Sequence, residues 1–304
     1  MEGFLNIREA IDKYIAGCQT KVSMSKENLI AKSILAGALI GMGAAASSVA
    51  AHTIPDVGLA RLAAAAVFPV GLMMVILLGA ELFTGDCLMA MSISDGKHSM
   101  KEVVRVLISV YIGNFIGAAV LALLINMSGQ LNYSGGMLGA YTIKVAMGKA
   151  NISFSEGLTS GLLCNILVCA AVLMAICAKD VTGKLIAVFF TIMLFVTAGF
   201  EHCVANMYYI TAGLLAKMNP TYAALAMEQY GYGLEQMHEL NVYNFLVTNL
   251  IPVTIGNILG GIVFLGLPLY YMNVKKAEKN DNSMAKEDMK NGYIRTTDVA
   301  GIVR

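Results

Sequence analysis

The sequence predicts an all-α membrane protein with six transmembrane helices in two inverted three-helix repeats, of which the second and fifth helices are broken. Three observations predict this fold: an apolar composition, six apolar segments of sufficient length, and motifs that recur in the second half of the chain. Of the 304 residues, 57% are hydrophobic and only 13% are charged, and the mean hydropathy is +0.68. Soluble domains of this length do not approach such a balance, which is typical of membrane proteins.

Six apolar segments follow one another along the chain, and each exceeds the roughly 20 residues that a helix needs to cross the hydrocarbon core of a bilayer. Between them they define a transmembrane domain over residues 29–272, flanked by a cytoplasmic N-terminal segment (1–28) and a polar, mobile cytoplasmic tail (273–304). The predicted spans are 29–51, 62–93, 104–127, 156–178, 185–216 and 244–272.

The basic residues set the predicted orientation of these spans. If both termini are cytoplasmic, the inside segments hold 16 of the 21 Lys and Arg residues, the outside loops hold four, and Lys32 lies within a span. This asymmetry predicts a multi-pass protein of the plasma (inner) membrane with both ends inside. Residues 1–28 are polar and of mixed charge, so we expect no cleaved signal peptide.

The second and fifth segments are the long ones, and each carries a polar motif. A straight helix of about 32 residues would measure roughly 48 Å against a hydrocarbon core of about 30 Å. GAELFTGD (79–86) and GFEHCVAN (199–206) both fit the pattern G-x-E-x-x-x-x-[D/N]. We therefore expect both helices to be broken, near 83–86 and near 200–203, with the two breaks meeting at the membrane midplane.

The third and sixth segments carry a second repeat, IGNFIG at 112–117 and IGNILG at 255–260. Two related halves of three spans each must lie in opposite orientations, because three is odd. The result is an inverted repeat, a fold in which sites lie near the midplane between the halves.

The polar residues at the predicted breaks indicate a pore. A break frees backbone groups that must be buried in protein or line a cavity. We expect Glu81, Glu201 and Asn206 to be structural, each carboxylate accepting hydrogen bonds from the unwound backbone of its own break, since a central charge costs at least ~2.5 kcal/mol and needs partners. Thr84 is interpreted as functional, because Gly85 beside it permits a loop whose hydroxyl faces the cavity.

His202 is the one histidine of four that falls at the centre of a span, and we interpret it as functional. A pKa near ~6.5 in the unperturbed side chain suits attracting an anion or passing it a proton. The alternative is a hydrogen-bonded core residue. Phe195 precedes His202 by two helical turns, and Phe68 and Leu72 form an i, i+4 pair that could close the path, although spacing alone favours core packing.

Other chemistries find little support in the sequence. The basic residues are too scattered for nucleic acid binding, and the six cysteines form no C-x-x-C pair, so we expect free buried thiols without disulfides, zinc or another metal. No cofactor-binding motif is present, and we expect no enzyme. A distant alternative is an intramembrane thiol enzyme that uses Cys203 with His202, but neighbouring residues on a helix do not face each other.

Taken together, the stretches AELFTG, LLCNILVCAAVLMA, GFEHCVANMYYI and NLIPVTIGNILGG resemble the motifs of the formate/nitrite transporter family over residues 26–271. The resemblance implies an aquaporin-like protomer in a homopentamer within the lipid bilayer, each protomer having its own pore for a small monovalent anion. Formate ranks first among the substrates on family frequency, and nitrite and hydrosulfide remain open. Transport could be passive or proton-linked through the central histidine.

The resemblance also implies site residues. The family's central histidine matches His202 and its loop threonine matches Thr84, while the asparagine of the fourth span matches Asn165. The lysine before that span matches Lys149, which we expect to be a solvent-accessible cation. Asp86 departs from the family pattern, where polar uncharged residues are common. The apolar constrictions fall on Phe68, Leu72, Leu82, Phe83, Val168 and Phe195.

Overall fold

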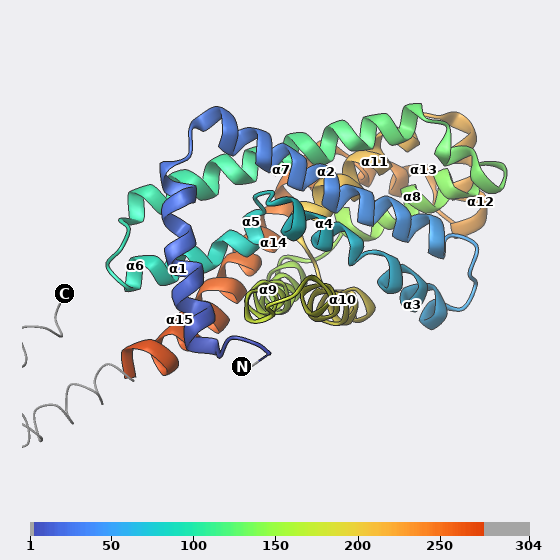
Figure 1. The fold of residues 1–304 in the computed structure, drawn as a ribbon. Helices are drawn as coiled ribbons and strands as arrows, with labels where there is room; N and C mark the ends of the chain where they lie inside the picture. Colours follow the sequence, from blue (N-terminus) through green and yellow to red (C-terminus); the bar gives the residue numbers. More distant parts are fainter. Residues whose placement is uncertain (1–2, 277–304) are drawn as a thin grey trace, which may run out of the picture.

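Residues 3–276 are described in the computed structural model of this protein, and they form a bundle of helices (Figure 1). The β pairing in this part of the chain is limited to one antiparallel bridge between Phe4 and Ala178. The predicted tail lies outside the described residues from residue 277 onward.

Within residues 3–276, six helices are long and apolar enough to cross a membrane, which confirms the predicted number of spans. They begin where the sequence supplies a side chain that accepts a hydrogen bond from the first helical turn, such as Ser25, Ser99, Ser153 and Asp180. The six are α2 (Lys26–Ala51), α3 with α4 (Val57–Leu78), α7 (Met100–Met127), α9 (Phe154–Cys177), α10 (Val181–Ala198) and a last helix over Asn244–Lys275.

The last helix is continuous in direction but contains wide turns between its regular parts. Its successive parts are η3 (Asn244–Leu250), α14 (Ile251–Leu259), η4 (Gly260–Gly266), α15 (Leu267–Tyr270) and η5 (Tyr271–Lys275). Pro252 and Pro268 lie at the start of α14 and α15. Proline lacks the backbone N–H that a regular helical turn would use, so local adjustment of the ladder is expected there.

Both long segments are broken, as predicted. Helix α4 (Val70–Leu78) ends because Gly79 adopts a left-handed conformation with φ 64°, and α5 (Phe83–Asp86) begins after three non-helical residues, of which Leu82 is extended. Helix α10 ends in the same way at Gly199, with φ 75°, before α11 (Cys203–Lys217). The first break therefore lies at 79–82, and its predicted place at 83–86 was wrong. Gly79, with no Cβ, takes the left-handed turn, whereas Gly85 lies within α5.

Beyond α5, the second segment continues as η1 (Cys87–Met89) and α6 (Ala90–Ser94). The connections at the opposite end of the bundle are η2 (Gln130–Gly136), α8 (Met137–Ala150), α12 (Pro220–Tyr230) and α13 (Leu234–Glu239). Figure 1 shows α12 and α13 at one end of the bundle, and α1, α6 and α15 at the other.

The repeated I-G-N-x-x-G motifs lie where corresponding helices of the two halves pack closely together. A Cβ at Gly117 would lie 1.9 Å from the Ile34 carbonyl oxygen, and a Cβ at Gly260 would lie 2.1 Å from that of Leu162. Helix α7 thus meets α2 at the same close distance at which the last helix meets α9. Small residues permit this approach in membrane helices, and the equivalence supports the predicted inverted repeat.

The N-terminal segment folds as α1 (Ile7–Ser23), which opens with a capping box between Asn6 and Glu9. Its apolar face is buried against the bundle, including Ile11 and Tyr14. Helix α1 therefore packs beneath the membrane-crossing helices, at the same end as the last described turns (Figure 1).

Candidate functional site

The two helix breaks meet through a hydrogen bond between Thr84 and His202. Thr84 Oγ1 lies 2.8 Å from His202 Nε2, and both side chains are buried. The Ala205 backbone N–H donates to His202 Nδ1 at 3.1 Å. Because Nδ1 accepts, a neutral ring carries its proton on Nε2 and donates it to Thr84. The Thr84 hydroxyl proton then remains free to donate to a third group.

Asn114, from the first I-G-N triplet, satisfies the backbone of the first break. Its Oδ1 accepts from the Phe83 N–H at 2.9 Å, and its Nδ2 donates to the carbonyls of Ser33 at 2.7 Å and Glu81 at 2.9 Å. The side chain is fully buried. One amide therefore replaces the helical hydrogen bonds that the break removes.

Asn257, from the second triplet, does the same for the second break. Its Oδ1 accepts from the Cys203 N–H at 2.9 Å, and its Nδ2 donates to the carbonyls of Gly161 at 2.7 Å and Glu201 at 3.0 Å. Asn165 joins the two breaks, because its Nδ2 donates both to the Thr84 carbonyl at 3.1 Å and to the Asn257 carbonyl at 2.6 Å. Asn165 thereby holds the backbone that carries Thr84.

The two glutamates have partners other than those predicted. Glu81 accepts from the ammonium of Lys21, a residue of α1. Glu201 accepts from Lys149 at 2.8 Å and from Asn206 Nδ2 at 2.6 Å. The expectation that each carboxylate binds the unwound backbone was wrong, because the I-G-N asparagines already occupy that backbone. The carboxylates instead neutralise one lysine in each half.

Lys149 is correspondingly less available than expected. Its side chain is only 18% exposed, its Nζ pairs with Glu201, and the Tyr209 ring lies 5.3 Å away. Lys149 is therefore a paired cation that keeps partial access to solvent, and its predicted role as a cation that attracts the anion stays a prediction. Removing Lys149 would leave the Glu201 carboxylate buried without its counter-charge, which costs more than the loss of a surface cation.

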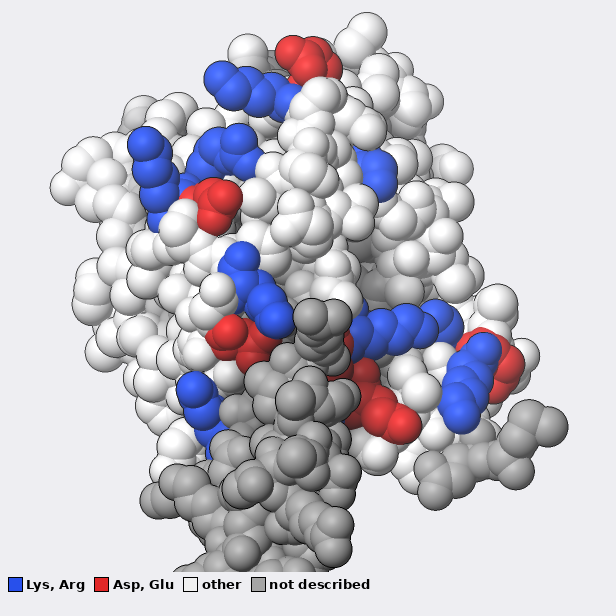
Figure 2. Space-filling model, turned by 60° about the vertical axis from the view of Figure 1, so that its left-hand side comes forward, with Lys and Arg blue, Asp and Glu red and all other residues white. Residues whose placement is uncertain are grey.

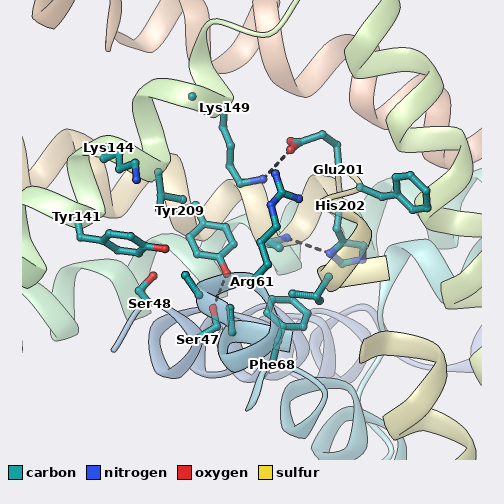
Figure 3. Close-up of a pocket in the computed structure, with 18 of the residues that line it drawn as sticks. Ser47, Ser48, Arg61, Phe68, Tyr141, Lys144, Lys149, Glu201, His202 and Tyr209 are labelled. Atoms are coloured by element: carbon teal, nitrogen blue, oxygen red, sulfur yellow. Dashed lines mark hydrogen bonds and ion pairs between the residues drawn. The ribbon is translucent and has the colours of Figure 1, made fainter. Parts of the chain in front are cut away.

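A pocket of about 470 Å³ lies toward the end of the bundle opposite α1, and His202 is one of the residues that line it (Figure 3). Phe68 and Phe195 also line it, with their rings edge to face at a centroid distance of 5.6 Å. Phe195 lies 6.1 Å from the His202 ring. The two phenylalanines and the histidine therefore line the same cavity.

The pocket carries net positive charge. Of its charged lining residues, Arg61, Lys144 and Lys149 are cations and Glu201 is the one anion, which leaves a formal balance of +2. Figure 3 shows Arg61 and Lys149 extending into the same space. Arg61 reaches it by passing over Gly199, where an added Cβ would lie 2.1 Å from Nη1. Cationic clefts of this kind concentrate anions.

The remaining predicted constriction residues are not among those that line this pocket. Leu72, Leu82 and Val168 are buried. Phe83 packs against Tyr111 with a centroid distance of 4.8 Å and lines a separate apolar groove beside α7, away from the cationic pocket. Residues 3–276 contain no cluster of three His, Cys, Asp or Glu side chains that could hold a metal ion, and the six thiols are free.

Sequence reasoning missed Lys21, Arg61 and Lys144. Each is a basic residue outside the apolar core of a span, so the local sequence does not mark it. Asn114 and Asn257 could have been found, because they are the polar centre of a repeat that was recognised only as evidence of duplication.

Comparisons with known proteins agree with this geometry. The sequence profile described as "Formate/nitrite transporter" matches residues 8–271. The formate channel FocA of Haemophilus influenzae is 39% identical over 215 residues, which cover 71% of this chain and 75% of that protein.

Solved structures are similar as well. A pentameric formate channel with formate bound superimposes with a TM-score of 0.72 at 33% identity, over 81% of this chain and 97% of that one. An FNT family ion channel has the same TM-score at 27% identity, over 87% of this chain and 98% of the other.

Proposed function

Because this chain belongs to the formate/nitrite transporter family, we propose that it is a membrane channel for small monovalent anions, with formate as its main substrate. The hydrogen bond between Thr84 and His202, a residue that lines the cationic pocket, carries the proposal. It places a free hydroxyl donor where two helix breaks meet, which suits an anion stripped of part of its water. Nitrite and hydrosulfide share the size and charge of formate and are the alternatives.

The proposed path begins in the cationic pocket. The +2 balance attracts an anion, which then passes between Phe68 and Phe195. A bare anion pays a large desolvation cost between apolar side chains, whereas its neutral acid pays far less. Thr84 compensates part of this cost by donating its hydroxyl proton in a hydrogen bond. We expect the leucine and valine side chains beyond it, including Leu72 and Val168, to form a second narrow passage.

We propose that transport is proton-linked. If a proton from water binds Nδ1 of His202, that nitrogen can no longer accept from the Ala205 N–H, so this hydrogen bond breaks. Nε2 then passes its proton to Thr84 Oγ1, and the Thr84 hydroxyl proton moves to the anion. His202 is left neutral with its proton on Nδ1, and the neutral acid crosses the apolar passage.

We propose that both termini are cytoplasmic and that the protein lies in the inner membrane as a homopentamer. Helix α1 and the last described turns lie at the same end (Figure 1), and Lys and Arg side chains are spread over that face (Figure 2). This agrees with the excess of basic residues in the segments predicted to be inside. A similar structure is described as pentameric. Residues 1–28 and 273–304 would flank the channel domain of 29–272.

Purified protein in liposomes tests the function and the proton linkage together. With formate, nitrite, hydrosulfide and lactate supplied in parallel, we expect formate to be transported faster than the bulkier lactate. Internal pH should change by about one proton per formate, and little current should flow, because the crossing species is neutral. Sustained current of one charge per anion without a pH change would refute proton transfer. Absence of flux for all three small anions would refute the channel.

The double variant Arg61→Gln, Lys144→Gln is expected to raise the formate concentration for half-maximal flux by roughly three- to tenfold at low salt, with little change at saturation. The cations attract the anion from a distance and do not touch it at the centre. The difference should shrink in 0.5 M salt, where the Debye length is only about 4 Å. Lys97→Gln is the control, because Lys97 is exposed near the α1 end. Equal concentration dependence in the double variant and the control would contradict a steering role.

A further inference from the structure

The two halves of the repeat differ at one charged position. Asn206 in the second half corresponds to Asp86 in the first, five residues after Glu201 and Glu81 respectively. In the second half, Asn206 donates to Glu201, and Lys149 pairs with the same carboxylate. One cation, one anion and one neutral amide leave that cluster without net charge.

In the first half the corresponding cluster is not balanced. Asp86 has no amide hydrogen to donate, so Asp86 and Glu81 both accept from Lys21, with Asp86 Oδ1 at 2.5 Å from its Nζ. Asp86 is 2% exposed, and its Oδ2 has no hydrogen-bond partner in the described part of the chain. Two ionised carboxylates on one ammonium give a net charge of −1.

Lys21 itself stays protonated. Burial by itself lowers the pKa of its ammonium, but the carboxylates of Asp86 and Glu81 outweigh this and raise the pKa above its usual value. Because its pKa is raised, Lys21 remains a cation through neutral pH. The net charge of −1 must therefore be balanced at the carboxylates.

Among the groups that act most strongly on Asp86, Lys21 is the one cation. The other titratable groups in its electrostatic neighbourhood are Tyr14 and Cys18 of α1, Cys87, and Cys169 of α9. The Tyr14 hydroxyl donates to the Gly85 carbonyl at 3.1 Å, and the Cys169 thiol donates to the Thr84 carbonyl. These donors are already engaged with backbone next to Asp86. A proton bound to Oδ2 of Asp86 would neutralise the excess negative charge of the buried carboxylate pair, and it would occupy the oxygen that has no hydrogen-bond partner.

We propose that Asp86 is a proton-binding site on the α1 side of the pathway, and that its occupancy sets how readily an anion passes there. With both carboxylates ionised, an anion at this end meets a charge of −1, in contrast to +2 in the pocket at the other end. Protonation of Asp86 leaves Lys21 paired with Glu81 alone and removes the repulsion. This inference rests on the proposed anion transport and adds a second titratable group to it, separate from His202.

Asp86→Asn tests the site, because it recreates the arrangement of the second half, with an amide that can donate to Glu81. In oriented proteoliposomes, formate flux through the unaltered protein should rise several-fold as the pH on the α1 side is lowered. Asp86→Asn should transport formate at high pH as fast as the unaltered protein does at low pH, so its flux should not depend on the pH on the α1 side. Asp12→Asn is the control, since Asp12 is an exposed carboxylate of α1, the helix that also carries Lys21. An unchanged pH profile in Asp86→Asn would overturn the proposal.

A second measurement does not depend on transport. Infrared difference spectra recorded across a pH step should contain a carboxylic acid C=O band in the unaltered protein and in Asp12→Asn. The band should be absent in Asp86→Asn and in Asp86→Ser, a second neutral variant in case the first folds poorly. Retention of the band in both neutral variants would overturn the proton site even if formate is transported. Absence of flux in every variant would count against the channel function alone.

Discussion

Replacing His202 with phenylalanine is expected to lower formate flux by roughly tenfold or more while the protein stays folded. The substitution removes the Nε2–H that orients the Thr84 hydroxyl, and it puts a fully apolar ring in place of the imidazole beside Phe68 and Phe195. A hydrogen bond to a charged group is worth ~1.5–3 kcal/mol, and 1.4 kcal/mol corresponds to a factor of ten. Stopped-flow uptake into liposomes, with thermal unfolding as the measure of folding, checks the prediction.

Thr84 supplies the matched pair for this experiment. Thr84→Ser keeps the hydroxyl and should retain most of the flux, whereas Thr84→Val keeps the shape and should lose flux in parallel with His202→Phe. Unaltered flux in well-folded His202→Phe would assign the histidine to a structural role and remove the donor chain from the mechanism.

Replacing Asn257 with leucine is expected to have the largest effect on folding. It leaves the Cys203 N–H and the carbonyls of Gly161 and Glu201 without their partner in a dry interior. Each unsatisfied buried group costs ~1–3 kcal/mol, so the sum is comparable to the whole stability of many domains. We expect little folded protein after membrane extraction, as measured by size-exclusion chromatography.

Asn114→Leu should behave in the same way, because Asn114 makes the equivalent three contacts at the first break. Asn151→Ala is the control, since Asn151 is exposed, donates to the Met147 carbonyl one turn earlier, and accepts from Asn244 at 3.4 Å. If the two leucine variants yield as much folded protein as the control, the I-G-N asparagines are not what holds the broken backbone.

The sequence by itself determined the membrane class, the six spans and the duplication. These features depend on composition over some twenty residues and on recurring motifs, which a linear pattern records. It also singled out Thr84 and His202 as candidate site residues, because polar residues inside apolar segments stand out and the resemblance to a family points to them. The place of the first break was missed by four residues, since GAELFTGD holds two glycines and only the folded backbone distinguishes them.

The tertiary structure alone decided which groups meet. Lys21 reaches Glu81 and Asp86 across 60 and 65 residues, and Asn257 reaches Glu201 across 56. A lysine on a short amphipathic helix looks like any surface lysine, and its partner depends on how α1 packs beneath the bundle. Whether a buried carboxylate is balanced is therefore a property of packing. The sequence shows that Asp86 stands where the second half has Asn206. Only the fold shows that Asp86 and Glu81 share the ammonium of Lys21, so that this difference adds one negative charge to the cluster.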